Sequence, residues 1–332
     1  MNNPFWEEMV KAAELSAYQA NEQLDGPDSV HAGPCWCFYR YGQSSTKLPD
    51  GRTVLIAGEH EDSYDSDFYI YNDVTVRHPD GRLDIFGYPC SDFPPTDFHS
   101  ATLVDNRIVL VGNLGYPEDR KVSITQAAIL QLSDFSIHRV ETEGDCPGWL
   151  HGHDARLATD AAGIVIAGGK MDRGSGHPLI ENIDEWQLDL QSWQWRRLTE
   201  RAWLRWDIHR ADHRPNRLFQ VSSARWHREF GQRFTSAADC DAFWKATDEQ
   251  MDAITELYRP GIQHDPLPST TEEHNVHRVV VAGVVVRFVE EMHSVQMTVE
   301  GNLDASVASQ LAEEVREKLA ALESVPYEMQ RI

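Results

Sequence analysis

The residues most able to do chemistry in this sequence are carboxylates gathered in one short segment. Between residues 59 and 67 the chain carries five acidic side chains in nine positions. Such a cluster can bind calcium, but the twelve-residue calcium loop with its central glycine and terminal glutamate is absent. We therefore interpret residues 59–67 as an acidic loop that is available to a partner.

Histidines form the second group of candidates. His99 and His153 stand at equivalent points before two similar segments. Histidine can serve as a general base, so an enzyme that places His99 and His153 in a central funnel is one hypothesis. A histidine that recurs with a repeat is more often used for packing or for a turn hydrogen bond, and we expect that role here.

Metal and cofactor motifs are weak or missing. His209 and His213 are four residues apart and could share a helical face, but zinc needs a third ligand at tetrahedral distance. Cys35 and Cys37 have no further cysteine pair to complete a site. No phosphate-binding loop, zinc-protease motif or nucleophile elbow is present. We predict no catalytic residue, no metal and no cofactor.

The overall charge restricts the partners. The 332 residues include 53 acidic and 30 basic side chains, which gives a net charge of −23 and a pI near 4.9. DNA, RNA and anionic membranes attract basic surfaces, so we expect none of them as a partner. No apolar run reaches the ~18–20 residues of a membrane span. The sequence does not open like a signal peptide and has only five cysteines, which predicts a cytoplasmic protein.

A repeat organises the first two thirds of the chain. Segments that begin at Leu48, Leu103 and Leu157 each read leucine, a turn with aspartate, an apolar strand and glycine. The turn aspartates, Asp50, Asp105 and Asp160, are 55 residues apart. A second hairpin follows in each period, so each period predicts four strands. Four-stranded sheets bury both faces when they stack radially, which is the architecture of a β-propeller.

The third period carries a resemblance. Gly168 and Gly169 follow a strand, and Trp186, Trp193 and Trp195 come later in the period. This pattern resembles the kelch repeat over roughly residues 35–200, and the resemblance implies a propeller that contacts other proteins. Only three periods are clear. Either residues 202–233 with a strand near 35–41 make a fourth blade, or the array is an open arc.

The flanking segments complete the predicted organisation. We expect a capping helix in a segment 1–28, a kelch-like region at 29–235 and an α+β domain at 236–332. The last domain is predicted to hold a helix at 236–258, a linker at 264–273, three strands within 276–300, and a helix capped by Asp304. The basic segment 196–233 is expected to dock on its own acidic propeller. The predicted fold class is mainly β: a small or incomplete kelch-like β-propeller of three to four blades, followed by a small α+β domain.

The loops after the second strand of each period, at 59–67, 113–125 and 170–182, should meet at one rim, where repeat proteins tend to bind. The predicted partner-binding residues are Glu59, Glu61, Asp62, Tyr64, Asp65, Asp67, Tyr116, Met171 and His177. Segments 93–95 and 148–150 are expected at the opposite rim, which is the alternative binding surface.

These patterns favour a non-catalytic protein-binding module with a basic protein partner. A concrete form is an acidic inhibitor, of the immunity-protein type, that neutralises a basic protein by charge complementarity. The alternatives are the funnel enzyme and a structural scaffold that dimerises through its C-terminal domain.

Overall fold

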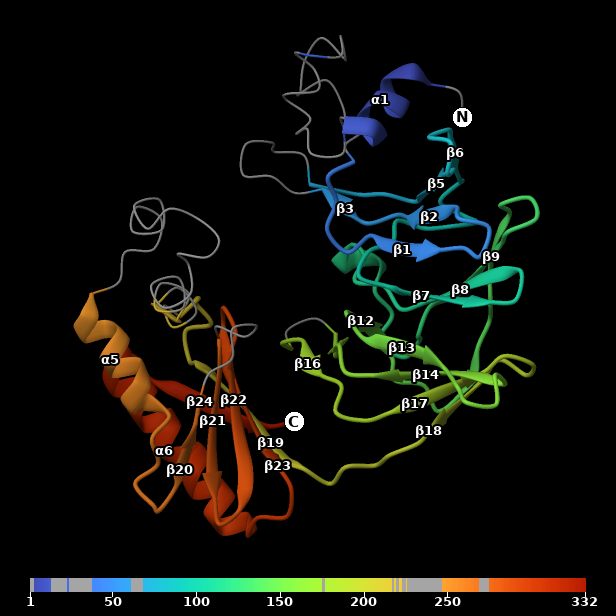
Figure 1. Ribbon diagram of the computed structural model, residues 1–332. Coiled ribbons are helices and arrows are strands. Elements are labelled where there is room, and N and C mark those ends of the chain that lie inside the picture. Colours follow the sequence, from blue (N-terminus) through green and yellow to red (C-terminus); the bar gives the residue numbers. More distant parts are fainter. Residues whose placement is uncertain are drawn as a thin grey trace. The chain divides into compact units, whose positions relative to one another are not determined.

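Three antiparallel meanders form the first part of the chain (Figure 1). The computed structural model describes residues 3–12, 23, 38–60, 68–174, 177–216, 218, 221–222, 225, 247–268 and 275–332. These residues fall into two units, Met1–Arg201 and Ala202–Ile332. Most of the regular structure is strand, and helices concentrate in the second unit. The predicted mainly β fold class, with an α+β unit after it, is confirmed.

Each meander has four strands in chain order. The first sheet contains β1 (Ser44–Lys47), β2 (Thr53–Ile56), β5 (Asp73–Arg77) and β6 (Leu83–Gly87). The second contains β7 (Ser100–Val104), β8 (Arg107–Val111), β9 (Ala127–Gln131) and β10 (Ile137–Arg139). The third contains β13 (Asp154–Leu157), β14 (Gly163–Ala167), β17 (Trp186–Asp189) and β18 (Gln194–Arg197), and β11 (Glu143–Gly144) pairs parallel with β18.

Small elements lie between the second and third strands of all three sheets. A hairpin of β3 (Glu59–His60) and β4 (Tyr69–Ile70) follows β2. A three-stranded sheet of β12 (Trp149–His151), β15 (Lys170–Asp172) and β16 (Ile180–Glu181) adjoins the third meander. A short 3-10 helix, η1 (Pro117–Asp119), lies between β8 and β9.

The predicted aspartate turns close the hairpins. The carboxylate of Asp50 accepts a hydrogen bond from the amide of Arg52 at 3.0 Å, and Asp160 accepts one from the amide of Ala162 at 3.0 Å. Asp105 itself takes a positive φ of 52° in a two-residue turn. Asn and Asp tolerate this conformation better than most residues, which is why the period is visible in the sequence.

Neighbouring sheets share apolar cores. One cluster joins the first and second sheets through residues such as Ile56 and Leu130, and another joins the second and third through Val109 and Ile164. On the far side of the first sheet, Met9 and Val10 of helix α1 (Pro4–Ala12) pack with Leu55 and Ile85. Helix α1 thus covers that face, as expected of a capping helix; residues 13–22 and 24–28 of the predicted segment lie outside the described residues.

The third sheet ends the series differently. On the face of this sheet that points away from the second sheet, one row of paired residues runs across the four strands: Arg156, Val165, Gln187 and Arg196. Three of these four side chains are polar or charged. Within the described residues of the first unit, no further four-stranded sheet follows. The fourth blade considered for residues 202–233 does not form from β19 (Leu204–Arg210), because that strand pairs with β23 and β24 of the second unit.

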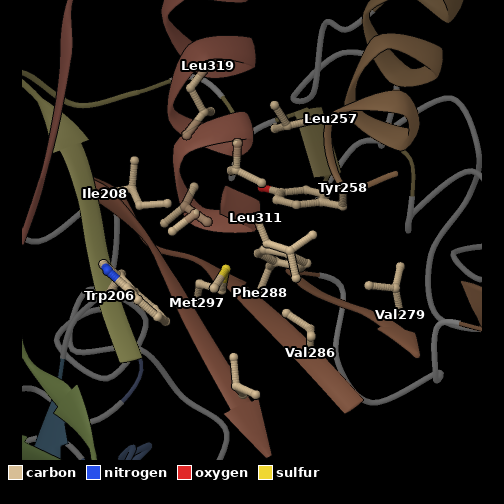
Figure 2. Packing of buried hydrophobic residues seen from close by; sticks show 14 of the residues in the cluster. Trp206, Ile208, Leu257, Tyr258, Val279, Val286, Phe288, Met297, Leu311 and Leu319 are labelled. Carbon is tan, nitrogen blue, oxygen red and sulfur yellow. The ribbon is translucent and has the colours of Figure 1, made fainter. Parts of the chain in front are cut away.

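The second unit is one sheet with helices against one face. Its strand order is β20-β21-β22-β23-β19-β24, with every neighbouring pair antiparallel. The strands other than β19 are β20 (Asp265–Leu267), β21 (Val276–Val281), β22 (Val284–Glu290), β23 (Ser294–Glu300) and β24 (Tyr327–Arg331). Figure 2 shows Trp206 and Ile208 of β19 in the same core as Leu311 and Leu319 of helix α6 (Ala305–Glu323).

Several predictions for this unit can be compared with the structure. Asp304 caps α6 as expected, since its side chain accepts from the amides of Ser306 and Val307. Helix α5 (Asp248–Leu257) lies in the predicted helix 236–258, and residues 236–246 lie outside the described residues. Within the predicted linker 264–273, residues 265–267 form β20 instead. The units divide after Arg201, whereas the sequence suggested 235, because β19 completes the C-terminal sheet.

Candidate functional site

All long connections of the first unit lie at one end of its sheets. In an antiparallel meander the connections alternate between the two ends. The turns at 48–52, 78–82, 105–106, 132–136, 158–162 and 190–193 therefore share one end. The opposite end, here called the connection end, is formed by the described parts of seven segments: 38–43, 57–72, 88–99, 112–126, 140–153 without β11, 168–185 and 198–201. Strand β11 is left out because it pairs with the start of β18, beside the turn at 190–193.

This geometry corrects one expectation. Residues 93–95 and 148–150 were placed on the opposite rim, but they belong to connections that reach the first strand of the next sheet, so they lie at the connection end too. The indole N–H of Trp149 donates to the carbonyl of Leu114 at 2.9 Å, and the Gly58 amide donates to the carbonyl of Thr96 at 2.9 Å. The two proposed rims are a single surface.

Exposed apolar side chains collect at the same end. Six large apolar residues of the first unit are exposed by 39–48% in the described structure: Tyr39, Tyr41, Phe68, Val122, Ile124 and Leu198. Each belongs to a segment of the connection end, and none lies in the six turns at the other end. Phe68 packs edge-on against Tyr116, and Tyr39 against Tyr41.

The predicted site residues have different fates. His177 is exposed, Met171 is half-buried against the third core, and Tyr116 is half-buried with its hydroxyl accepting from the Ile70 amide at 3.0 Å. Glu59 is only 9% exposed, because the pairing of β3 with β4 turns it inward. It is therefore not the direct contact residue that the sequence predicted. Glu61, Asp62, Tyr64, Asp65 and Asp67 lie outside the described residues.

Glu59 belongs to a buried polar group that the sequence did not reveal. Asp97 is fully buried, and its carboxylate accepts from the Gly115 amide at 2.7 Å. Burial raises the pKa of Asp97, while hydrogen bonds with Gly115 and with the side chain of Glu59 oppose that rise.

The charge of Arg120 acts on Asp97, and the Arg120 side chain also fixes the neighbouring loops. Arg120 donates to the carbonyls of Leu114 and Gly115 at 3.0 and 3.1 Å and to Asp172 of β15 at 3.1 Å. His151 lies near the same guanidinium; burial, then the charges of Arg120 and Lys170, lowers its pKa to about 4. These contacts tie the β8–β9 connection to the three-stranded sheet of β12, β15 and β16.

His99 and His153 do not line an open funnel. Both are buried, and each hydrogen-bonds through Nε2 to a serine of the preceding sheet. Burial, with the neighbouring histidine, lowers the pKa of His99 to about 3 and that of His153 to about 4, so both rings are neutral at pH 7. The funnel placement is therefore wrong, and the packing interpretation accounts for both residues.

The described residues show few other chemical groups placed for catalysis. His209 lies in strand β19, not on a helix, and stacks on His213 with ring centroids 5.7 Å apart. Within the described ranges, no three histidine, cysteine, aspartate or glutamate side chains are placed to hold a metal ion. In the same ranges no helix is long and apolar enough to cross a membrane.

A cavity of about 440 Å³ opens at the connection end. Its apolar lining includes Phe93, Pro95, Leu110, Ile124, Ala127 and Trp149. Comparison with known proteins adds no assignment: no family model matches the chain, and no curated protein is significantly similar to it.

Proposed function

We propose that this protein is a non-catalytic binding module whose connection end takes a basic protein partner. The observation that carries the proposal is the placement of all six exposed large apolar side chains of the described first unit at that end. Interfaces obtain most of their binding energy from a few such residues, especially aromatic ones. Tyr39, Tyr41 and Phe68 supply the aromatic groups.

The charge of the same segments supports a basic partner. The seven segments of the connection end, with β11 left out, contain 16 acidic and six basic residues in the sequence. An acidic surface around apolar anchors attracts a positively charged protein and accelerates encounter. An inhibitor that neutralises a basic protein is the concrete form that this arrangement favours. The kelch-like organisation of the repeats remains part of the proposal.

A capture experiment tests the proposal. The full-length protein is tagged and exposed to a lysate of its own cells, the captured protein is identified and purified, and its affinity is measured at ~0.01 M and ~0.15 M salt. The Debye length falls from about 30 to about 8 Å over this range, so affinity should fall at least about tenfold. A partner that is not basic, or an affinity that ignores salt, overturns the proposal.

Two variants sharpen the result. Phe68→Ser with Val122→Ser removes two exposed apolar groups from the connection end and should weaken the purified partner at least about tenfold. Met292→Ser is the matched control, since Met292 is 60% exposed but belongs to the second unit. Equal loss in both variants would show that the connection end is not the binding surface.

A further inference from the structure

The cavity at the connection end has the size and lining of a binding pocket. Its volume of about 440 Å³ lies within the range of about 300–1,000 Å³ typical of ligand sites. Phe93 and Trp149 line it although each is only 2% exposed, while Ile124 is 44% exposed. The pocket therefore includes one of the six exposed apolar residues, Ile124.

Hydrogen bonds hold the walls in place. The Trp149 indole donates to the Leu114 carbonyl at 2.9 Å, and the Thr125 hydroxyl donates to the Gly148 carbonyl at 2.7 Å. On the other wall, the Phe93 amide donates to the Pro89 carbonyl at 3.0 Å, ahead of the Pro94–Pro95 pair. A pocket fixed by such bonds loses little conformational freedom when it is filled.

Four charged side chains also line the pocket: Asp119, Lys121, Arg139 and Glu141. Among the described residues none of the four takes part in an ion pair. Two carboxylates are thus available to cations, and the two basic side chains balance their charge within the lining. The negative surplus comes from the surrounding connections, for example from Glu118 next to Asp119. The apolar lining within these acidic connections favours an apolar group that is carried by a basic chain.

We propose that this pocket anchors one large apolar side chain, such as tryptophan, from a partner segment with lysine or arginine on both sides. The proposal rests on the proposed function and specifies its recognition mode. The apolar side chain fills the space between Phe93, Ile124 and Trp149, and the flanking cations meet Asp119 and Glu141. Burial of such an anchor in a preformed pocket is how a few residues come to dominate an interface.

The test uses two synthetic peptides and the full-length protein. Both peptides are rich in lysine and arginine; one has a single central tryptophan and the other has serine there. Fluorescence polarisation should show the tryptophan peptide binding at least about tenfold more tightly. Ile124→Ser should remove most of this preference. Met292→Ser should retain it, because Met292 is 60% exposed but belongs to the second unit and does not line the pocket.

The charged residues give a separate readout. Asp119→Asn with Glu141→Gln should weaken both peptides by a similar factor and leave the preference for tryptophan intact. If the wild-type protein binds both peptides equally, or if Ile124→Ser keeps the preference, the pocket proposal fails while a salt-dependent basic partner remains supported. If neither peptide binds, the pocket proposal also fails, and the capture experiment decides the proposed function independently.

Discussion

Nε2 of His153 lies 2.9 Å from the hydroxyl oxygen of Ser100, and one repeat earlier Nε2 of His99 lies 2.8 Å from that of Ser44. In each pair, the residue just before the first strand of one sheet is bonded to the first residue of the preceding sheet. The Gly152 amide also donates to the Phe98 carbonyl at 2.7 Å alongside the later pair. Successive sheets are therefore joined by polar bonds as well as by apolar cores.

The first prediction concerns the stability contributed by this joint. His153→Ala should lower the free energy of unfolding by about 2–3 kcal/mol, because it leaves a cavity and removes the hydrogen bond to Ser100. Ser100→Ala should cost about 1 kcal/mol. His138→Ala is the control: His138 is exposed in β10, so its change should stay within about 0.5 kcal/mol. Chemical denaturation measures all three, and an unaltered midpoint for His153→Ala would contradict the packing role.

The second prediction concerns acid. The pKa of His153 is about 4 in the folded protein and that of His99 about 3, against about 6.5 in an unfolded chain. Between these values the unfolded state binds more protons, so stability falls as the pH decreases below 6.5. Each histidine should remove about 2 kcal/mol between about pH 7 and pH 5.

A substitution isolates this effect. Gln43 occupies the position equivalent to His99 and His153 in the first repeat, so glutamine is compatible with the site. His153→Gln should flatten the dependence of the unfolding free energy on pH between about 6.5 and 4.5. Denaturation curves across that range provide the measurement. A variant with the wild-type slope would mean that His153 does not remain neutral in the folded protein.

The third prediction separates backbone strain from close approach. Gly112 has φ +79°, and a Cβ there would lie 2.5 Å from the Leu150 carbonyl oxygen and 2.6 Å from Cε1 of His153. Gly168 has φ +66° but no atom within 4 Å of such a Cβ. Gly168→Ala should cost about 1–2 kcal/mol, and Gly112→Ala at least about 2 kcal/mol more. Thermal unfolding compares them, and equal losses would show that the sheets can separate enough to admit a methyl group.

Local features of the fold could be predicted from the sequence. Aspartate turns such as those at Asp50 and Asp160 are formed by neighbouring residues, so the repeat and its four strands were visible. The N-cap at Asp304 is equally local. The place where the first unit ends was not visible, because β19 pairs with residues 294–299 and 327–331, which lie far along the chain.

The candidate site was only partly predictable. Because connections in an antiparallel meander alternate between its two ends, the long connections were predicted to converge. The same alternation also places residues 93–95 and 148–150 at the connection end, which the sequence analysis did not recognise. Asp97 resembles an ordinary loop aspartate. When its segment is aligned with residues 150–153, Asp97 takes the position of His151. This alignment of two ionisable residues was the one indication in the sequence of a polar group at this point. Burial of Glu59 depends on the β3–β4 hairpin, which no short-range pattern specifies.

The series of sheets in the first unit ends differently on its two sides: helix α1 covers the first sheet, and the polar row with Arg156 and Arg196 faces outward from the third. The middle sheet makes the same histidine–serine hydrogen bond with both neighbours. The number of sheets is therefore set by the two ends and not by the repeat itself. A chain with one additional copy of residues 99–152 would keep both ends of the series and gain one four-stranded sheet. The connection end would then be longer by one set of connections.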